Sequence, residues 1–317
     1  MLSYTGLRNL FGSLTNDTAT ANLTLGDQLI NNSIRAVCSL RPWPFLERET
    51  DRTVLTVASQ SGYQIPAGFR KLSSLYVTVG TTDYQPVFVE SDEQWNTILA
   101  SNLGTDDAAQ FWHRKGDKVF LEPAPATAAN TITFRGHQSP RDLSIADYTT
   151  GTVVSVANGG VTVVGNGTTW TASMAGRWIR ITESDTANKG DGFWYEILSV
   201  TDATHLTLVK PYNGTAIVAG AAAYTIGQMS VIPESYEMAP VFRATAIYYL
   251  KEDVTAYEKF MRLYDGGVEA GLSQSYMGVV GRMIDECGSK TDSPYSAPLD
   301  LNPIDPNDPP RTLVTGV

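Results

Sequence analysis

The sequence predicts an α+β protein in which a helical bundle scaffold carries an antiparallel β region and an inserted all-β sandwich or barrel domain. Three observations predict this class. Helical periodicity dominates 24–46 and 231–287, near the two ends of the chain. Runs of β-branched and aromatic residues follow the first helical stretch. Residues 150–228 then hold six further short runs separated by Gly/Asn turns, which is typical of a small all-β unit.

These shifts of pattern divide the chain into four expected parts. The six runs of the small β unit interrupt the path from the strand region to the second helical stretch, as an inserted domain would. The expected parts are an N-terminal arm (1–23), a core of helices and strands (24–149 and 229–287), an inserted β domain (150–228) and a proline-rich extended C-terminal arm (288–317).

The first core helix has a clear start and stop in the sequence. Thr24 can cap it, with Asp27 in the reciprocal position of a capping box. Apolar residues follow at helical spacing as far as Leu40. The helix must end there because Pro42 and Pro44 forbid continuation.

The second helical stretch is predicted to be one long helix. Pro233 opens it, and apolar residues recur at steps of three and four as far as Tyr264. A weaker helical stretch follows from about Val268 to Cys287. Residues 1–23, in contrast, show little periodicity and are rich in Thr, Asn and Ser, so we expect a loosely ordered arm.

A short aromatic segment, Arg41-Pro42-Trp43-Pro44-Phe45-Leu46, follows the first helix. Prolines fix both aromatic residues, and no polar constellation accompanies them. Because aromatic side chains bury large areas, we expect Trp43 and Phe45 to plug the core beneath the helix end rather than to bind a ligand.

Strands and turns dominate the rest of the core and the insertion. We expect an antiparallel meander in the core, with one short helix capped by Ser91 and running through Ala100. The expected core strands are 53–57, 74–79, 87–90, 118–121 and 131–135. The expected strands of the insertion are 151–156, 161–164, 177–182, 193–200, 205–210 and 222–226.

Composition excludes several classes of protein. The formal net charge of −10 and the absence of a basic block argue against binding nucleic acid by phosphate neutralisation. Cys38 and Cys287 lie far apart, so we expect two reduced thiols rather than a disulfide framework. We see no secretion signal, and no apolar stretch approaches the roughly 20 residues of a membrane helix. We therefore expect a soluble protein made inside a cell.

The sequence offers little catalytic chemistry. His113, His137 and His205 have no ligand partners at metal-binding spacing, and there is no phosphate-binding glycine loop or nucleophile elbow. We therefore expect no catalytic, metal or cofactor site. One alternative stays open for the insertion, because four carboxylates lie near two tryptophans, as a glycan-binding module or depolymerase would require. These residues are Glu183, Asp185, Asp191 and Glu196, with Trp178 and Trp194.

The C-terminal segment beyond Gly288 is rich in proline, which excludes a helix or a central strand. It is either a disordered end or an extended arm that docks on a partner. The candidate docking residues are Pro294, Tyr295, Pro298, Leu301, Pro303, Ile304, Pro306, Pro309 and Pro310.

Two phrases and the order of elements suggest a family. Residues 63–72, YQIPAGFRKL, place an aromatic residue three positions after an Ile-Pro pair, and residues 232–236, IPESY, repeat this form before the long helix. With the first helix ending in RPWPF, the layout of residues 24–265 resembles the head-to-tail adaptors of tailed bacteriophages, including the tail tubular protein of short-tailed phages. The matching framework residues are Arg35, Trp43, Phe45, Ile65, Pro66, Phe69, Ile232, Pro233 and Tyr236.

The resemblance implies a structural virion protein that is not an enzyme. Adaptors of this family form rings, usually of twelve copies, that dock beneath the portal and continue the DNA channel toward the tail or nozzle protein. The resemblance thus implies a virion location in the neck, after assembly in the host cytoplasm, without membrane contact or sequence-specific DNA binding. A tail-tube or head-closure ring is the alternative among virion proteins. The 150–228 insertion departs from compact adaptors.

Overall fold

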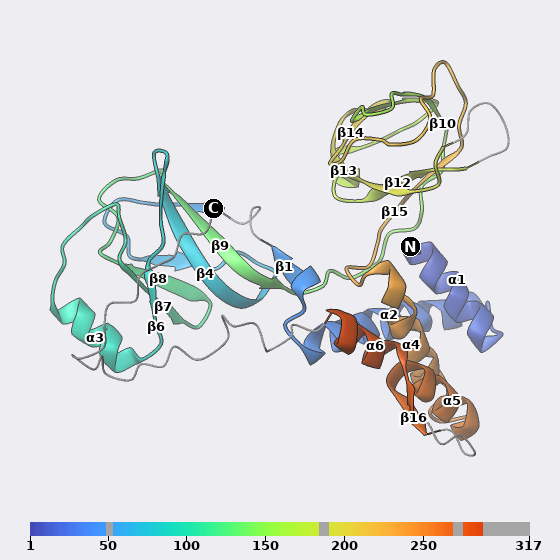
Figure 1. Ribbon diagram of the computed structural model, residues 1–317, viewed down its shortest axis with the longest axis horizontal. Coiled ribbons are helices and arrows are strands. Elements are labelled where there is room, and N and C mark those ends of the chain that lie inside the picture. Colours follow the sequence, from blue (N-terminus) through green and yellow to red (C-terminus); the bar gives the residue numbers. More distant parts are fainter. Residues whose placement is uncertain (49–52, 184–189, 269–274, 288–317) are drawn as a thin grey trace, which may run out of the picture.

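The computed structural model describes residues 1–48, 53–183, 190–268 and 275–287, and Figure 1 shows that they form three lobes. The helical lobe contains the helices from both ends of the chain, α1, α2 and α4–α6. The β lobe contains β1–β9 and α3. The barrel lobe contains β10–β15. The mixture of helices and antiparallel sheets confirms the α+β class.

The helical lobe is built around α2, which packs against both α1 and α4, and these two helices also contact each other. Leu7 and Phe11 of α1, Ile34 of α2 and Val241 of α4 are almost fully buried in one hydrophobic core. The elements of this lobe are α1 (Tyr4–Thr15), α2 (Thr20–Leu40), the 3-10 turns η1 (Pro44–Leu46) and η3 (Glu234–Tyr236), α4 (Met238–Tyr249), α5 (Val254–Asp265), β16 (Gly266–Val268), β17 (Ser275–Met277) and α6 (Val279–Cys287).

The expectation of a loosely ordered arm over residues 1–23 is wrong. Ser3 caps α1 by accepting a hydrogen bond from the Gly6 N–H at 3.2 Å. The α1 helix packs closely on α2, because a Cβ on Gly26 would lie only 2.5 Å from the ring of Phe11. The Thr, Asn and Ser content of 1–23 concealed this amphipathic helix, whose apolar residues pack in the core of the helical lobe, namely Tyr4, Leu7, Leu10, Phe11 and Leu14.

The first core helix ends at Leu40 as predicted, but it begins at Thr20 rather than Thr24. Thr24 lies inside the helix, where its hydroxyl donates to the Thr20 carbonyl at 2.9 Å. Asp27 does not close a capping box. It pairs instead with Arg8 of α1, with 3.2 Å between Nε and Oδ1, so packing against α1 extends α2 by one turn.

The long helix predicted from Pro233 to Tyr264 is interrupted. Pro233 precedes a 3-10 turn, and α4 ends at Tyr249. Asp253 then caps α5 by accepting from the Ala256 N–H at 3.0 Å, and α5 folds back onto α4. This reversal packs the apolar residues of α5 on α4, and the Phe260 ring stacks on the Tyr249 ring with centroids 6.1 Å apart.

The helical stretch expected from about Val268 to Cys287 is shorter than predicted. The described part before α6 is the hairpin of β16 and β17, in which Gly266 pairs with Met277. Gly266 has φ 90°, a conformation that strains residues with a side chain, and it ends α5.

Two sheets form the β lobe. The larger has the order β1-β9-β4-β5 with β2 also on β9, and the smaller has the order β3-β8-β7-β6. All pairs are antiparallel except β6 and β7, so the expected purely antiparallel meander is wrong at this point. The chain passes from β6 to β7 through α3, so the two strands run in the same direction. The elements are β1 (Glu47–Arg48), β2 (Thr53–Leu55), β3 (Gly62–Gln64), β4 (Phe69–Val79), β5 (Thr82–Tyr84), β6 (Val87–Val89), α3 (Asp92–Ala100), β7 (Phe111–Lys115), β8 (Lys118–Glu122) and β9 (Thr131–Gln138).

The barrel lobe has its own hydrophobic core and one six-stranded sheet, of order β10-β11-β14-β13-β12-β15. Bridges from Val153 to Ala222 and from Val156 to Ile217 join β10 to the segment before β15, so the sheet curls back on itself as a half-barrel. Each of the six predicted runs overlaps a strand, with bounds that differ by a few residues. The strands are β10 (Thr152–Val156), β11 (Thr162–Asn166), β12 (Trp178–Ile181), β13 (Trp194–Asp202), β14 (His205–Leu208) and β15 (Tyr224–Gly227), with a 3-10 turn η2 (Ala172–Met174).

Candidate assembly sites at the lobe junctions

The helical lobe and the β lobe meet at the C-terminus of α2. The last carbonyls of a helix lack partners within it. Here the Trp43 indole Nε1–H donates to the Val37 carbonyl at 2.8 Å. Arg70 of β4 donates to the carbonyls of Cys38 and Ser39 at 2.6 and 2.9 Å. One side chain of the β lobe therefore caps a helix of the helical lobe, and its positive charge favours the negative end of the helix dipole.

Burial at this junction also changes the pKa of the Cys38 thiol. Cys38 is 1% exposed, and desolvation raises its pKa to about 12, against a smaller opposing effect of Arg70. The thiol is therefore protonated at neutral pH and unreactive.

The barrel lobe is attached through two neighbouring segments, 139–147 and 228–231. The side chain of Gln228 joins them, because its Oε1 accepts from the Ser144 and Ile145 N–H groups at 2.8 and 3.0 Å. Asn31 of α2 in turn accepts from the Leu143 N–H at 2.8 Å and donates to its carbonyl at 2.9 Å. These reciprocal bonds fix the segment on the helical lobe.

The first residues of the chain pass between the barrel lobe and η3. The Trp194 indole of β13 donates to the Met1 carbonyl at 3.0 Å. The Leu2 N–H donates to Glu237 at 2.6 Å, and the Ser3 hydroxyl donates to Asp147 at 2.7 Å. The segment predicted to be a loose arm thus joins two lobes.

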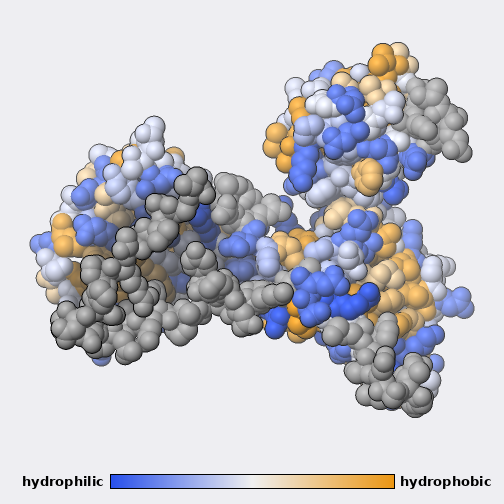
Figure 2. All heavy atoms as spheres, in the orientation of Figure 1, coloured by the Kyte–Doolittle hydropathy of each residue, from blue (hydrophilic) through white to orange (hydrophobic). Residues whose placement is uncertain are grey.

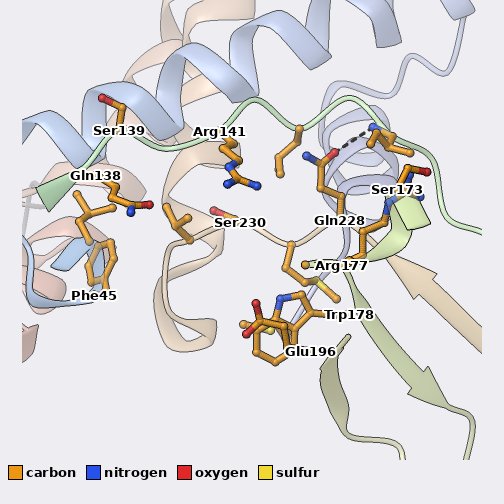
Figure 3. A pocket seen from close by; sticks show the side chains of 18 residues that line it. Phe45, Gln138, Ser139, Arg141, Ser173, Arg177, Trp178, Glu196, Gln228 and Ser230 are labelled. Carbon is orange, nitrogen blue, oxygen red and sulfur yellow. Dashed lines mark hydrogen bonds between the residues drawn. The ribbon is translucent and has the colours of Figure 1, made fainter. Parts of the chain in front are cut away.

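A cavity of about 330 Å³ lies at this junction. Arg141 extends into its open centre, and Trp178 and Glu196, which are register partners on β12 and β13, lie together on its barrel side (Figure 3). Arg177 also lines it. Burial lowers the pKa of Arg177, and its Nε has no hydrogen-bond partner among the described residues. The cavity therefore offers two guanidinium groups.

A groove of about 500 Å³ adjoins the cavity on the outer face of the barrel lobe, and both are lined by Trp178 and Glu196. Phe193, 70% exposed, stands at the groove together with Trp194. Arg180 lies over the Trp194 ring, 4.8 Å from its centroid. The remaining lining residues are Asp191, Tyr195, Val209, Lys210, Pro211 and Asn213.

The predicted framework residues do not form one site. Trp43, Ile232 and Tyr236 are buried in the core of the helical lobe, where Phe45 stacks on Trp43 at 5.6 Å, as expected of a plug. Pro233 precedes η3 in the same lobe.

The remaining framework residues lie elsewhere. Ile65 and Phe69 pack on the core of the β lobe, and Pro66 lies between them in the chain. Arg35 is half-exposed on α2 and pairs with Asp142. The capping Arg70 was not singled out from the sequence, although it lies within the YQIPAGFRKL phrase. The candidate docking residues from Pro294 to Pro310 lie outside the described residues.

One of the four carboxylates near the tryptophans, Asp191, has hydrogen-bond partners that fix the local structure. Asp191 accepts from the Phe193 N–H at 3.1 Å and from the Tyr195 hydroxyl. Asp185 lies outside the described residues. Glu183 contacts the turn at Gly192, since a Cβ there would lie 3.5 Å from its side chain.

His113 and His205 have polar partners within the described residues. The Nδ1 of buried His113 lies 2.8 Å from the Val89 carbonyl, and Nε2 lies 2.9 Å from Asp92 at the start of α3. His205 pairs with Asp202 in the β13–β14 turn. Within the described residues, no group of three or more His, Cys, Asp or Glu side chains could hold a metal ion. In that same part of the chain, no helix has the length and hydropathy needed to cross a membrane.

Residues 2–159, just under half of the chain, match the family model of the SU10 adaptor protein, a phage adaptor family. The match begins at α1, spans the junction of the helical and β lobes, and ends after β10. No curated protein matches the chain. The match supports a structural phage adaptor, and therefore a virion component.

Proposed function

We propose that this protein is the head-to-tail adaptor of a tailed phage, of the kind found in necks and in tail tubular proteins. It forms a ring, of twelve copies, beneath the portal and continues the DNA channel to the tail or nozzle protein below. The observation that carries this proposal is the adaptor match over residues 2–159, which includes the contacts of Trp43 and Arg70 between two lobes.

The division of the chain into lobes suits such a ring. In this proposal the helical lobe is the bundle scaffold of the ring, and the inserted domain, 150–228, reaches a neighbouring virion component. The net charge of −10 suits a channel wall past which DNA slides, since like charges do not bind phosphates. The protein acts without catalysis.

The helical lobe also offers a surface for contacts between copies. Figure 2 shows a broad hydrophobic area on this lobe in the view drawn. Leu25, Leu250 and Val254 are large apolar residues of the lobe that are 42%, 51% and 65% exposed. Exposed apolar area of this kind is typical of surfaces that other chains cover.

Native mass spectrometry of the chain, alone and mixed with the phage portal, tests the proposal. We expect twelve copies bound to each portal ring. A chain that stays monomeric and separate from the portal would contradict it. A chain that forms rings without binding the portal would favour the tail-tube or head-closure alternative.

The candidate arm, 288–317, has a role of its own in this proposal, which is to dock on the portal or on the adjacent protomer in the assembled ring. Deleting 291–317 is expected to weaken attachment to the portal and to leave the circular dichroism spectrum of the described lobes unchanged. Unchanged attachment would contradict the docking role.

A second candidate function has one observation in its favour, the groove that Trp178 and Trp194 line on the barrel lobe. Aromatic rings of this kind can stack on sugars. Binding to a glycan array that is lost on Trp178→Ala would support a glycan-binding role. The absence of binding to any glycan on the array would contradict that role.

A further inference from the structure

The groove on the barrel lobe has the chemistry of a site for an extended proline-rich peptide. Such peptides adopt the polyproline II conformation and bind in grooves lined by aromatic side chains. Trp178, Phe193 and Trp194 supply the aromatic surface here, and Pro211 and Val209 add apolar area. Phe193 is 70% exposed, so its ring is available to a peptide.

The groove adjoins a cavity that carries two guanidinium groups and one carboxylate, that of Glu196. Trp178 and Glu196 line both the groove and the junction cavity, so one extended peptide could contact both. Lys210 lines the groove, and Arg141 and Arg177 line the cavity. The guanidinium group of Arg177, which lines the cavity, can pair with an incoming carboxylate.

This chain carries a segment with the matching pattern. Pro303, Pro306 and Pro309 recur every three residues, which places them on one side of a helix with three residues per turn. Asp305 and Asp308 recur with the same period and therefore lie together on a different side. The segment thus presents apolar rings to the aromatic residues of the groove and carboxylates to the two arginines of the cavity.

The last turn of the last described helix contacts η3, which follows residues that line the cavity. The Tyr236 hydroxyl donates to Glu286 in the last turn of α6. Tyr236 belongs to η3, and Ser230 and Val231, shortly before it, line the junction cavity. Residues 288–302 can span up to about 50 Å when extended, so residues 303–310 have ample length to return to the barrel lobe.

We infer that residues 303–310 bind in the groove and junction cavity of the same chain before assembly. The prolines pack on Trp178, Phe193 and Trp194, and the aspartates approach Arg177, Arg141 and Lys210. This binding holds the candidate arm on its own subunit until a partner displaces it. The inference does not depend on the ring, because it concerns the unassembled chain.

Protection from trypsin tests the inference in the full chain. Arg311 directly follows the proposed bound segment, so binding should slow cleavage after it. We expect Phe193→Ala to accelerate this cleavage about tenfold, which corresponds to about 1.4 kcal/mol of binding. Leu198→Ala is the matched control, because Leu198 is 60% exposed on β13 and does not line the groove. It should leave the rate unchanged.

Equal cleavage rates in the wild type, Phe193→Ala and Leu198→Ala would overturn the inference. A second measurement identifies the occupant directly. A photoreactive benzoylphenylalanine at position 193 should cross-link to a tryptic peptide that contains residues 303–310, within one chain and independently of concentration. Cross-links to another segment, or between differently labelled chains, would overturn it.

Failure of this inference can be distinguished from failure of the adaptor proposal. Portal binding is measured on the same variants, and Phe193→Ala is expected to retain it. A protein that fails to bind the portal but shows protection of Arg311 that depends on Phe193 would refute the adaptor proposal alone.

Discussion

Replacing Trp43 tests whether the junction of the helical and β lobes depends on this one side chain. Trp43 is 0% exposed and stacks on Phe45, and its indole N–H satisfies the Val37 carbonyl at the end of α2. Truncating a buried Trp to Ala costs about 3–5 kcal/mol. The unsatisfied carbonyl adds about 1 kcal/mol. We therefore expect Trp43→Ala to lower the free energy of unfolding by about 4–6 kcal/mol.

Trp43→Phe separates the two contributions. It keeps most of the aromatic volume and removes the N–H donor, so we expect a loss of about 1–2 kcal/mol. Urea denaturation followed by far-ultraviolet circular dichroism measures both variants, with half-exposed Leu40→Ala as a control that should change stability by less than about 0.5 kcal/mol. If Trp43→Ala loses less than about 1 kcal/mol, the side chain does not support the core as argued.

Three further predictions concern the helical and barrel lobes. Gly26→Ala should destabilise the protein by about 1 kcal/mol in thermal unfolding, because overpacking against Phe11 outweighs the gain in helix propensity; an increase in Tm would contradict this. Val254→Asp should weaken ring formation in native mass spectra without unfolding α5, whereas Val218→Asp, at a 79% exposed position of the barrel lobe, should not; equal effects would contradict a contact through the helical lobe. Cys38, whose pKa burial raises to about 12, should resist iodoacetamide at pH 8 and react only in urea, as peptide mass spectrometry would show; rapid reaction of the folded protein would contradict its burial.

Local patterns predicted much of the fold. Alternation and turn residues placed each of the six barrel strands, because these signals lie within a few residues of each strand. Pro42 placed the end of α2, and Ser91 placed the start of α3, where its hydroxyl accepts from the Glu93 N–H at 3.2 Å. Burial of Trp43 followed from the large area of its ring.

Features set by tertiary contacts could not be predicted in this way. The α1 helix depends on the fit of Phe11, in a stretch that composition alone presents as polar, against Gly26 of α2. The reversal between α4 and α5 depends on a single cap, Asp253, within a continuous helical pattern. The parallel pairing of β6 and β7 depends on the crossover through α3.

The candidate sites depended even more on contacts distant in sequence. Arg70 caps a helix about thirty positions earlier in the chain. Gln228 joins two linkers that are far apart in sequence, and Trp194 meets the carbonyl of Met1. From the sequence, only the family resemblance indicated a function. The region that matches the family model begins within residues 1–23, which the sequence analysis expected to be a loosely ordered arm.

The most direct test of the adaptor proposal is an electron microscopy image of the full chain mixed with purified phage portal. We predict a twelve-fold ring of this protein, coaxial with the portal, with an open channel through both and the barrel lobe on the outside. Portal particles without added density, beside free monomers of this chain, would contradict the proposal.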